Sequence, residues 1–238
     1  MNKMNKLNRI NVIDNLRGIA FILMIIQHIP YFYDITNGTN YCRNYIIDKC
    51  GKIARLLFIL LAGYSISIEY NKNKNNFTQR RFTRSIEVMI HAIIITLVTY
   101  NLYNDKFIRF GILHFMTLAT LITSFFVHDK VLSLVMLILL VSINNIPYLG
   151  SWNLIVGGPI FNSMMDWFPL IRWLPIMFIG LIIGQNSDIN ELNRINLIPF
   201  VNKHSILTEI GKSSLALYTG HFVLFSFIFS KFMNSNYK

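Results

Sequence analysis

Charged residues are scarce in this chain. Asp, Glu, Lys and Arg make up 14% of its 238 residues, whereas a typical soluble domain contains about 25%. Hydrophobic residues make up 53%, and the mean hydropathy is +0.46. This scarcity of charge excludes an ordinary soluble domain and predicts an all-α, multi-pass membrane protein whose surroundings are the lipid bilayer.

Several features of secreted, repetitive or metal-binding proteins are also lacking. No long polar domain or internal repeat interrupts the apolar runs, so we expect one membrane domain over residues 1–238. The first run passes through His28 and Pro30 without a small-residue cleavage site, which argues against a cleaved signal peptide. No His-x-x-x-His pair supports a metal site. Cys42 and Cys50 share one predicted loop, where a disulfide and two free thiols both stay open.

Basic residues outnumber acidic ones, 22 to 11. They lie mostly in short segments between apolar runs, where they orient a membrane protein, so we expect no nucleic-acid partner. The strongest group precedes the third apolar run and favours a cytosolic N-terminus. This group consists of Lys72, Lys74, Arg80, Arg81 and Arg84.

Seven apolar segments approach the length of about 20 residues that a helix needs to cross a bilayer. The sequence therefore predicts a bundle of about seven transmembrane helices. The segments are Leu16 to Tyr33, Ile53 to Ile68, Ile86 to Tyr103, Phe107 to Val127, Val131 to Tyr148, Leu170 to Gly184 and Ser213 to Met233.

The first apolar run carries polar groups that lipid would not favour. On a helix, Asp14, Arg17 and His28 fall along one stripe, and Asp14 can pair with Arg17 three residues on. Eleven residues at about 1.5 Å each place His28 roughly 16 Å beyond Arg17. The arginine is therefore expected at the inner surface and the imidazole beyond the middle of the membrane.

Four histidines lie within the predicted helices. Ionisable residues inside a membrane usually face a bundle interior or a watery cavity. The topology puts His28, His114 and His221 between the middle and the outer half of the membrane, where they can line one cavity, and His91 nearer the inner face. A neutral buried histidine can accept a proton from an attacking hydroxyl or amine, so we favour acid-base chemistry. For each histidine, packing against a backbone carbonyl is the structural alternative.

Arginines at the inner side are candidates for anion binding. Arg80 and Arg84 are one helical turn apart at the start of the third run, and Arg17 can lie nearby on the first. Guanidinium groups bind phosphate with paired donors, so this group suits a phosphorylated cytosolic cofactor. Orientation of the helix in the membrane explains the same residues without any ligand.

The segment over residues 149–169 contains neither Lys nor Arg. Trp152 and Trp167 can stack on a sugar ring there, although anchoring at the membrane interface explains them equally simply. Asn153 is a candidate donor to an oxyanion. Asp166 is the lone acidic residue of this segment.

Five stretches, taken in order, resemble the transmembrane acyltransferase superfamily, and most closely the catalytic domain of heparan-alpha-glucosaminide N-acetyltransferase and its microbial relatives. They span residues 13 to 221. They read IDNLRGIAFILMIIQH, FILLAGYSISI, IRFGILHF, DWFPLIRWLPIMFIGLIIG and IGKSSLALYTGH.

The resemblance implies an acyltransferase that takes an acyl group, usually acetyl, from coenzyme A on the cytosolic side. The acceptor would be a sugar amine or hydroxyl on the far side, and a homodimer is allowed. Carried over by position, His28 would act as a base or a transient acyl carrier, and His114 and Asp166 match motif positions in the family. The residues expected to hold the phosphates of acetyl-CoA are Arg17, Arg80 and Arg84.

The chain departs from some relatives at one position. Those relatives have Asn where His28 stands and a histidine in the loop that follows, whereas residues 34–52 here contain no histidine. The first helix must then supply the base.

Two other classes of protein fit the same residues. A proton-coupled transporter would also place histidines in a cavity, and an inactive structural membrane protein would not need them.

Overall fold

The computed structural model describes residues 11–103, 106–144, 165–187 and 206–235. Within these residues the chain forms eight α-helices, one short 3-10 helix, η1 (Tyr41–Arg43), and a single β-bridge. The prediction of an all-α protein is therefore confirmed. The α-helices are α1 (Asn11–Asn37), α2 (Tyr45–Lys72), α3 (Phe77–Tyr103), α4 (Ile112–Phe126), α5 (Lys130–Asn144), α6 (Leu170–Gln185), α8 (Ile206–Lys212) and α9 (Ser214–Ser235).

Each of the seven predicted apolar runs overlaps one of these helices. Of the described helices, α1, α2 and α3 are long and apolar enough to cross a membrane, and α8 with α9 forms a fourth candidate span that bends by 83°. The helices α4, α5 and α6 are apolar but shorter. The chain is thus a multi-pass integral membrane protein, although the described helices include fewer full-length spans than the seven expected.

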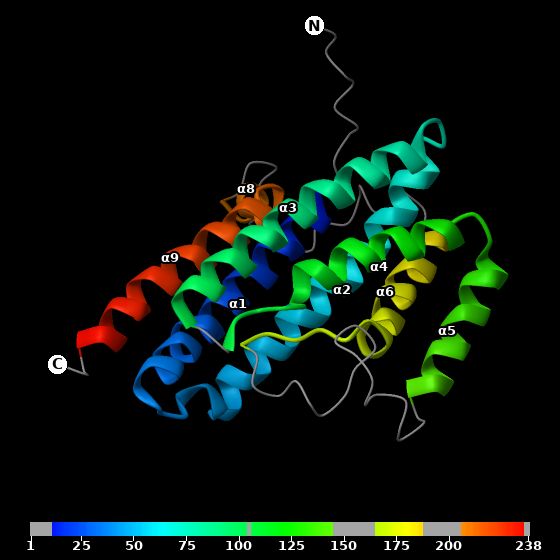
Figure 1. Cartoon of the computed structure of the whole chain (residues 1–238). Helices are drawn as coiled ribbons and strands as arrows, with labels where there is room; N and C mark the ends of the chain where they lie inside the picture. Colours follow the sequence, from blue (N-terminus) through cyan, green and yellow to red (C-terminus); the bar gives the residue numbers. More distant parts are fainter. Residues whose placement is uncertain (1–10, 104–105, 145–164, 188–205, 236–238) are drawn as a thin grey trace, which may run out of the picture.

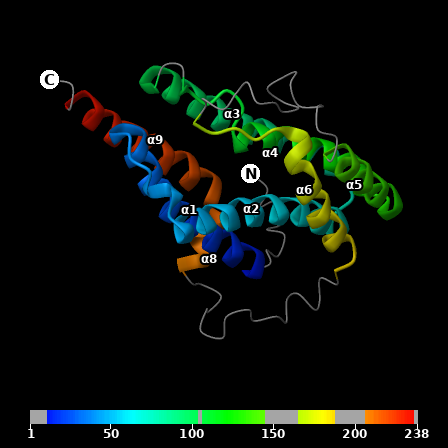
Figure 2. The same cartoon turned by 90° about the horizontal axis from the view of Figure 1, so that it is seen from below.

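The long helices surround a central space. α9 lies along α1 and α3, α4 lies along α3, and α6 lies between α2 and α5 (Figure 1). Seen along the perpendicular direction, α1 and α2 form one side of the bundle and α3 and α4 the opposite side (Figure 2).

The contact between α2 and α6 depends on glycine. A Cβ atom on Gly63 would collide with the carbonyl oxygen of Met177, and one on Gly180 would collide with that of Leu60. The hydroxyl of Ser67 donates to the carbonyl oxygen of Leu181 at 2.6 Å, beside this contact. Small residues let two membrane helices approach closely, and here they fix α6 against α2.

The start of α4 differs from the prediction. We expected a helix from Phe107, but α4 begins at Ile112 because the preceding backbone pairs with a distant segment. Phe110 forms the β-bridge with Trp167, and its carbonyl oxygen accepts from the amide of Phe168 at 3.0 Å. Periodicity of apolar residues cannot reveal this pairing, since the two segments are far apart in the chain.

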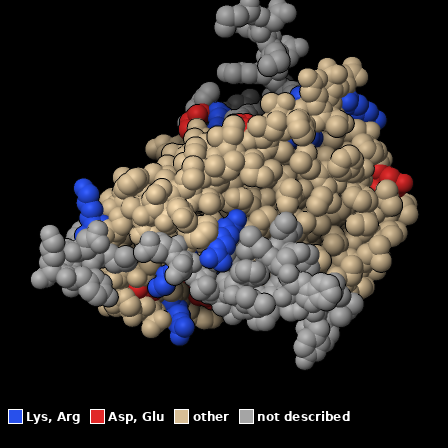
Figure 3. Space-filling model, in the orientation of Figure 1, with Lys and Arg blue, Asp and Glu red and all other residues tan. Residues whose placement is uncertain are grey.

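Most of the visible surface carries no charge. Figure 3 shows a broad face with few charged side chains; these lie mostly toward its margins, apart from a basic group near the middle of the view. Large apolar side chains such as Ile90, Leu97, Ile138 and Leu139 are exposed on α3 and α5. Exposed apolar surface of this kind is what a lipid environment requires.

The turn after α1 is held by Asp34. Its carboxylate accepts from the hydroxyl of Thr39 at 2.5 Å and from the amides of Tyr41 and Cys42 at 2.8 and 2.7 Å. Cys42 and Cys50 are both free thiols in the structure. The carboxylate, rather than a disulfide, therefore organises this loop.

Candidate active site

A large cavity opens between the helices. Its volume is about 1100 Å³, and its walls come from α1, α2, α3, α4, α8 and α9. This is the size of a pocket for a large cofactor or substrate, since small-molecule sites usually measure about 300–1,000 Å³. The charged lining residues are Asp14, Arg17, Glu69, Lys72, Arg81, Arg84, Glu209 and Lys212.

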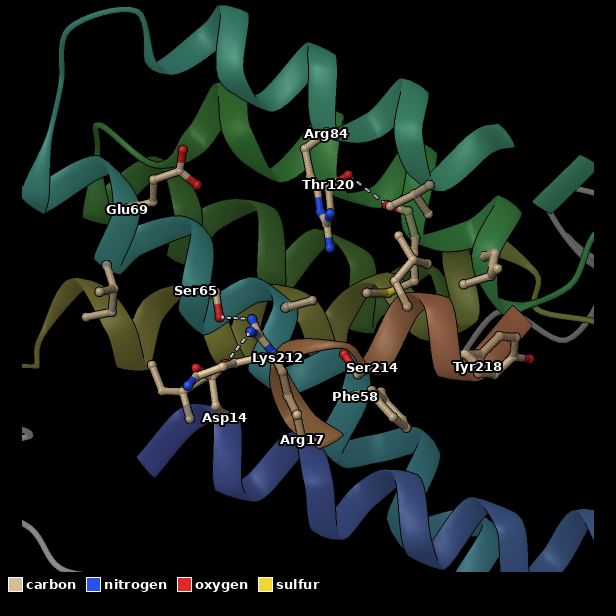
Figure 4. Close-up of a pocket in the computed structure, with 18 of the residues that line it drawn as sticks. Asp14, Arg17, Phe58, Ser65, Glu69, Arg84, Thr120, Lys212, Ser214 and Tyr218 are labelled. Carbon is tan, nitrogen blue, oxygen red and sulfur yellow. Dashed lines mark hydrogen bonds and ion pairs between the residues drawn. The ribbon is translucent and has the colours of Figure 1, made fainter. Parts of the chain in front are cut away.

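Arg17 joins two helices at the wall of this first cavity. Its Nη1 donates to Asp14 at 3.2 Å and its Nη2 donates to the hydroxyl of Ser65 at 2.7 Å. The predicted pairing of Asp14 with Arg17 is therefore confirmed. Figure 4 shows the guanidinium groups of Arg17 and Arg84 pointing into the same space from α1 and α3.

The three neighbouring arginines of α3 have different surroundings. Arg84 lines the first cavity and pairs with Glu87 at 2.6 Å. Arg81 also lines it and forms an ion pair with Glu69. Arg80 is not among the lining residues. It donates to Glu69 at 3.0 Å, and to the carbonyl oxygens of residues 73 and 75, so it closes the turn between α2 and α3.

A second, smaller cavity of about 100 Å³ adjoins the first. Three residues, Phe58, Ile112 and Tyr218, line both cavities and so form the wall or passage between them. The polar lining residues of the second cavity are Gln27, His28, Tyr31, Arg55, Asp166 and Tyr218.

His28 lies in the second cavity and contacts a histidine from the other end of the chain. Its Nδ1 is 2.8 Å from Nε2 of His221, which α9 presents to α1. The Nδ1 of His221 is 3.0 Å from the carbonyl oxygen of Leu217, one turn earlier on α9. The aromatic rings of Phe32 and Phe222 stand edge-on to His28 and complete its apolar surroundings.

Asp166 and Arg55 line the second cavity together with His28. Asp166 accepts from the amide of Ile112 at 3.1 Å, so it caps the start of α4 as well as lining the cavity. Arg55 donates to the carbonyl oxygen of Gly51 at 3.1 Å, and its guanidinium lies 6.0 Å from the ring of Trp173. Arg55, Asp166 and the proton-accepting His28 thus line the same small second cavity.

The structure separates the other two predicted histidines from these cavities. His114 lies at the start of α4, where its Nδ1 accepts from the amide of Gly111 at 3.3 Å and its Nε2 is 3.4 Å from the hydroxyl of Thr96. His91 is 2.9 Å from the hydroxyl of Thr219. Neither lines the first or the second cavity, and the same holds for His221, so His28 alone of the expected histidines lines a cavity, while His221 contacts His28.

Of the candidate residues in the segment 149–169 other than Asp166, only Trp167 lies within the described residues. Trp152 and Asn153 lie outside the described residues. Trp167 forms the β-bridge with Phe110 and is not among the residues that line the two cavities.

Several lining residues were not selected from the sequence. Arg55 lies inside the second predicted run, and an arginine inside a predicted membrane run is itself a signal of a polar interior. Arg81 belongs to the basic group that precedes the third apolar run, whereas Lys212 carries no sequence signal beyond its charge. Tyr218 carries no sequence signal beyond its position one turn before His221.

Fold and site together define a class of protein. It is a polytopic membrane protein with a large basic cavity that leads to a half-buried histidine. The chain matches the family described as heparan-alpha-glucosaminide N-acetyltransferase, catalytic, over residues 9–223, and it belongs to that family. Comparison with curated proteins and with solved structures finds no match. The family is one of membrane N-acetyltransferases that use acetyl-CoA as the donor.

Proposed function

We propose that this protein transfers an acetyl group from acetyl-CoA, held in the first cavity, to an amine or hydroxyl that reaches His28 in the second. The observation that carries this proposal is the shared wall of Phe58, Ile112 and Tyr218 between a basic cavity and a histidine chamber. A long substrate with anionic and reactive ends needs two such adjoining compartments.

The first cavity suits the nucleotide end of the donor. Arg17 and Arg84 approach from opposite walls, and Arg81 and Lys212 add further positive charge. Guanidinium groups bind phosphates through paired, charge-assisted hydrogen bonds. We assign the phosphates of acetyl-CoA to Arg17, Arg81, Arg84 and Lys212, and we assign Arg80 to the turn between α2 and α3.

The second cavity suits a short acyl group. Its volume of about 100 Å³ is less than a tenth of the roughly 1100 Å³ of the first cavity. The thioester would pass between Phe58 and Tyr218 to bring its carbonyl carbon to His28. An acetyl group fits this space, whereas a long acyl chain does not.

Membrane orientation assigns the two substrates to opposite sides. The basic segment before α3 favours a cytosolic N-terminus, which opens the first cavity toward cytosolic acetyl-CoA. The acceptor then enters from the far side. The name of the family indicates an amino sugar as the acceptor class, so a glucosamine-type amine is the first candidate and a sugar hydroxyl the second.

The chemical step requires a base and alignment. The acceptor nitrogen or oxygen attacks the thioester carbonyl carbon while Nε2 of His28 takes its proton. The carbon–sulfur bond then breaks, and the proton moves from His28 to the departing coenzyme A thiolate. Arg55 can stabilise the oxyanion, and Asp166 can orient an acceptor amine through a charge-assisted hydrogen bond.

The test is a transfer assay with purified protein, labelled acetyl-CoA and a panel of amino sugars, followed by mass analysis of the products. A general base contributes about 100- to 10,000-fold, so His28→Ala should lower the transfer rate by that factor while coenzyme A binding persists. His91→Ala, which lies outside both cavities, is the matched control. An undiminished rate in His28→Ala, or accumulation of an amino sugar inside vesicles without consumption of acetyl-CoA, would contradict the proposal.

The same assay separates direct transfer from a covalent route. Incubation with acetyl-CoA alone, followed by intact-mass measurement, should leave the protein unmodified if His28 acts as a base. A stable increase by one acetyl group that disappears in His28→Ala would instead make the histidine an acyl carrier.

A further inference from the structure

His28, which lines the second cavity, and His221, which contacts it from α9, form an aligned pair. Nδ1 of His28 and Nε2 of His221 are 2.8 Å apart. Their ring planes differ by 17° and their centroids are 5.1 Å apart, so the rings lie side by side in nearly one plane rather than face to face. This is the geometry of a well-aligned hydrogen bond between two imidazoles.

The direction of that hydrogen bond follows from the next one. Nδ1 of His221 lies 3.0 Å from the carbonyl oxygen of Leu217, and a carbonyl oxygen only accepts. The proton of His221 is therefore on Nδ1. A neutral imidazole has one donor and one acceptor nitrogen, so Nε2 of His221 accepts from Nδ1 of His28. Nε2 of His28 is then left without a proton.

We infer that His221 is a positioning residue that holds His28 in the tautomer whose bare Nε2 serves as the base. The reverse arrangement would turn a lone pair of His221 Nδ1 toward the Leu217 carbonyl oxygen. Such a contact would place two acceptors 3.0 Å apart with no proton between them, which is unfavourable. The chain of hydrogen bonds therefore selects one tautomer before any substrate binds.

Neighbouring rings keep the pair in place. Phe21 and Phe225 stand at right angles to His221, each with its ring centroid 5.5 Å away. Phe32 and Phe222 do the same for His28, at 6.3 and 5.8 Å. These side chains cannot compete for the imidazole nitrogens, because phenylalanine offers no conventional hydrogen-bonding group.

The consequence for transfer rests on the function proposed above. With Nδ1 of His28 donating to His221, Nε2 can take the proton of the acceptor and later return it to the coenzyme A thiolate. The resulting imidazolium keeps its hydrogen bond to the neutral His221, which gains and loses no proton. A His28 ring in the other tautomer would present an N–H to the acceptor and could not accept its proton.

Kinetics on three full-length variants tests the role. His221→Leu removes the acceptor for His28 and should lower kcat by about 10- to 100-fold, the range seen when a residue that orients a functional histidine is lost. The KM for acetyl-CoA should stay unchanged. His221→Gln retains an oxygen that can accept from Nδ1 and should recover most of the lost rate, while His91→Leu is the matched histidine control. Equal kcat in wild type and His221→Leu would overturn the inference.

Direct observation of the tautomer separates this inference from the proposed function. In protein labelled with 15N-histidine, in nanodiscs without acetyl-CoA, NMR should show His28 protonated at Nδ1 and bare at Nε2. His28→Gln identifies its signals, and wild-type protein gives the result even if His221→Leu does not fold. A proton on Nε2 of His28 would refute the inference, whatever the activity. The expected tautomer together with full activity in His28→Ala would instead refute the proposed function alone.

Discussion

Replacing Arg17 by Gln tests the first cavity most sharply, because this side chain has two separable duties. It lines the cavity with its guanidinium, and it is the hydrogen-bond donor to Asp14. The variant should therefore bind acetyl-CoA more weakly and also unfold more easily. A second substitution can distinguish the two effects.

The loss of affinity for acetyl-CoA can be estimated from one hydrogen bond between Arg17 and a phosphate. A hydrogen bond to a charged group contributes about 1.5–3 kcal/mol, which corresponds to roughly 10- to 150-fold in Kd. The side chain of Arg17 is 27% exposed, so solvent screening favours the lower part of this range, about 10- to 30-fold. KM for acetyl-CoA should rise by that factor with kcat nearly unchanged, since the phosphates lie far from the reacting carbon.

The loss of stability comes from Asp14. This residue is 2% exposed, and its Oδ2 has no hydrogen-bond partner among the described residues. Without Arg17, its Oδ1 would lose its donor as well. Leaving a buried polar group unsatisfied costs about 1–3 kcal/mol. A loss of about 2 kcal/mol lowers Tm by roughly 4–8 °C in a chain of this length.

The double variant Asp14→Asn, Arg17→Gln separates the two duties. It removes the uncompensated charge, so Tm should return toward the wild-type value while the affinity for coenzyme A stays low. Calorimetric titration with coenzyme A and thermal unfolding, both in nanodiscs, provide the two readouts. Wild-type affinity in the double variant would refute a phosphate contact by Arg17, as would wild-type affinity in the less stable single variant.

Two further predictions concern the turn after α2 and the loop after α1. Arg84→Ala should raise the KM for acetyl-CoA about tenfold. Arg80→Ala should leave this KM unchanged and lower Tm, because Arg80 holds the turn between α2 and α3. Equal effects of the two substitutions on KM would refute their different assignments. Burial, with the Asp34 carboxylate, raises the pKa of the Cys42 thiol to about 11. In a Cys50→Ser protein, alkylation of Cys42, followed by intact mass, should therefore be slow near about pH 8 and accelerate toward about pH 11, and Asp34→Asn should increase the slow rate. A rate near pH 8 equal to that of a free thiol would contradict this pKa.

The sequence was sufficient for the helices and for local contacts along them. Hydropathy located all seven apolar helical regions, because burial in lipid acts on each segment by itself. The pairing of Asp14 with Arg17 followed from their spacing of three residues and is present at 3.2 Å. His28 was singled out because a histidine in the middle of an apolar run is costly unless it faces a polar interior.

Contacts between distant segments needed the folded chain. Arg80 and Arg81 both neighbour Arg84 on a helix, at four and three residues, so spacing alone could not decide which lines the cavity. The structure turns Arg81 toward the cavity and Arg80 toward the turn. The start of α4 likewise depends on a backbone pairing between residues 110 and 168.

By itself, then, the sequence determined that this is a helical membrane protein with an arginine and a histidine on one face of its first helix. Tertiary structure alone decided that His221, 193 positions away, contacts His28 and that His114 does not. The physical reason is that hydrophobicity and helical spacing are properties of neighbouring residues. The direction of a hydrogen bond between two imidazoles depends instead on how α1 and α9 pack and on the carbonyl oxygen that faces the second ring.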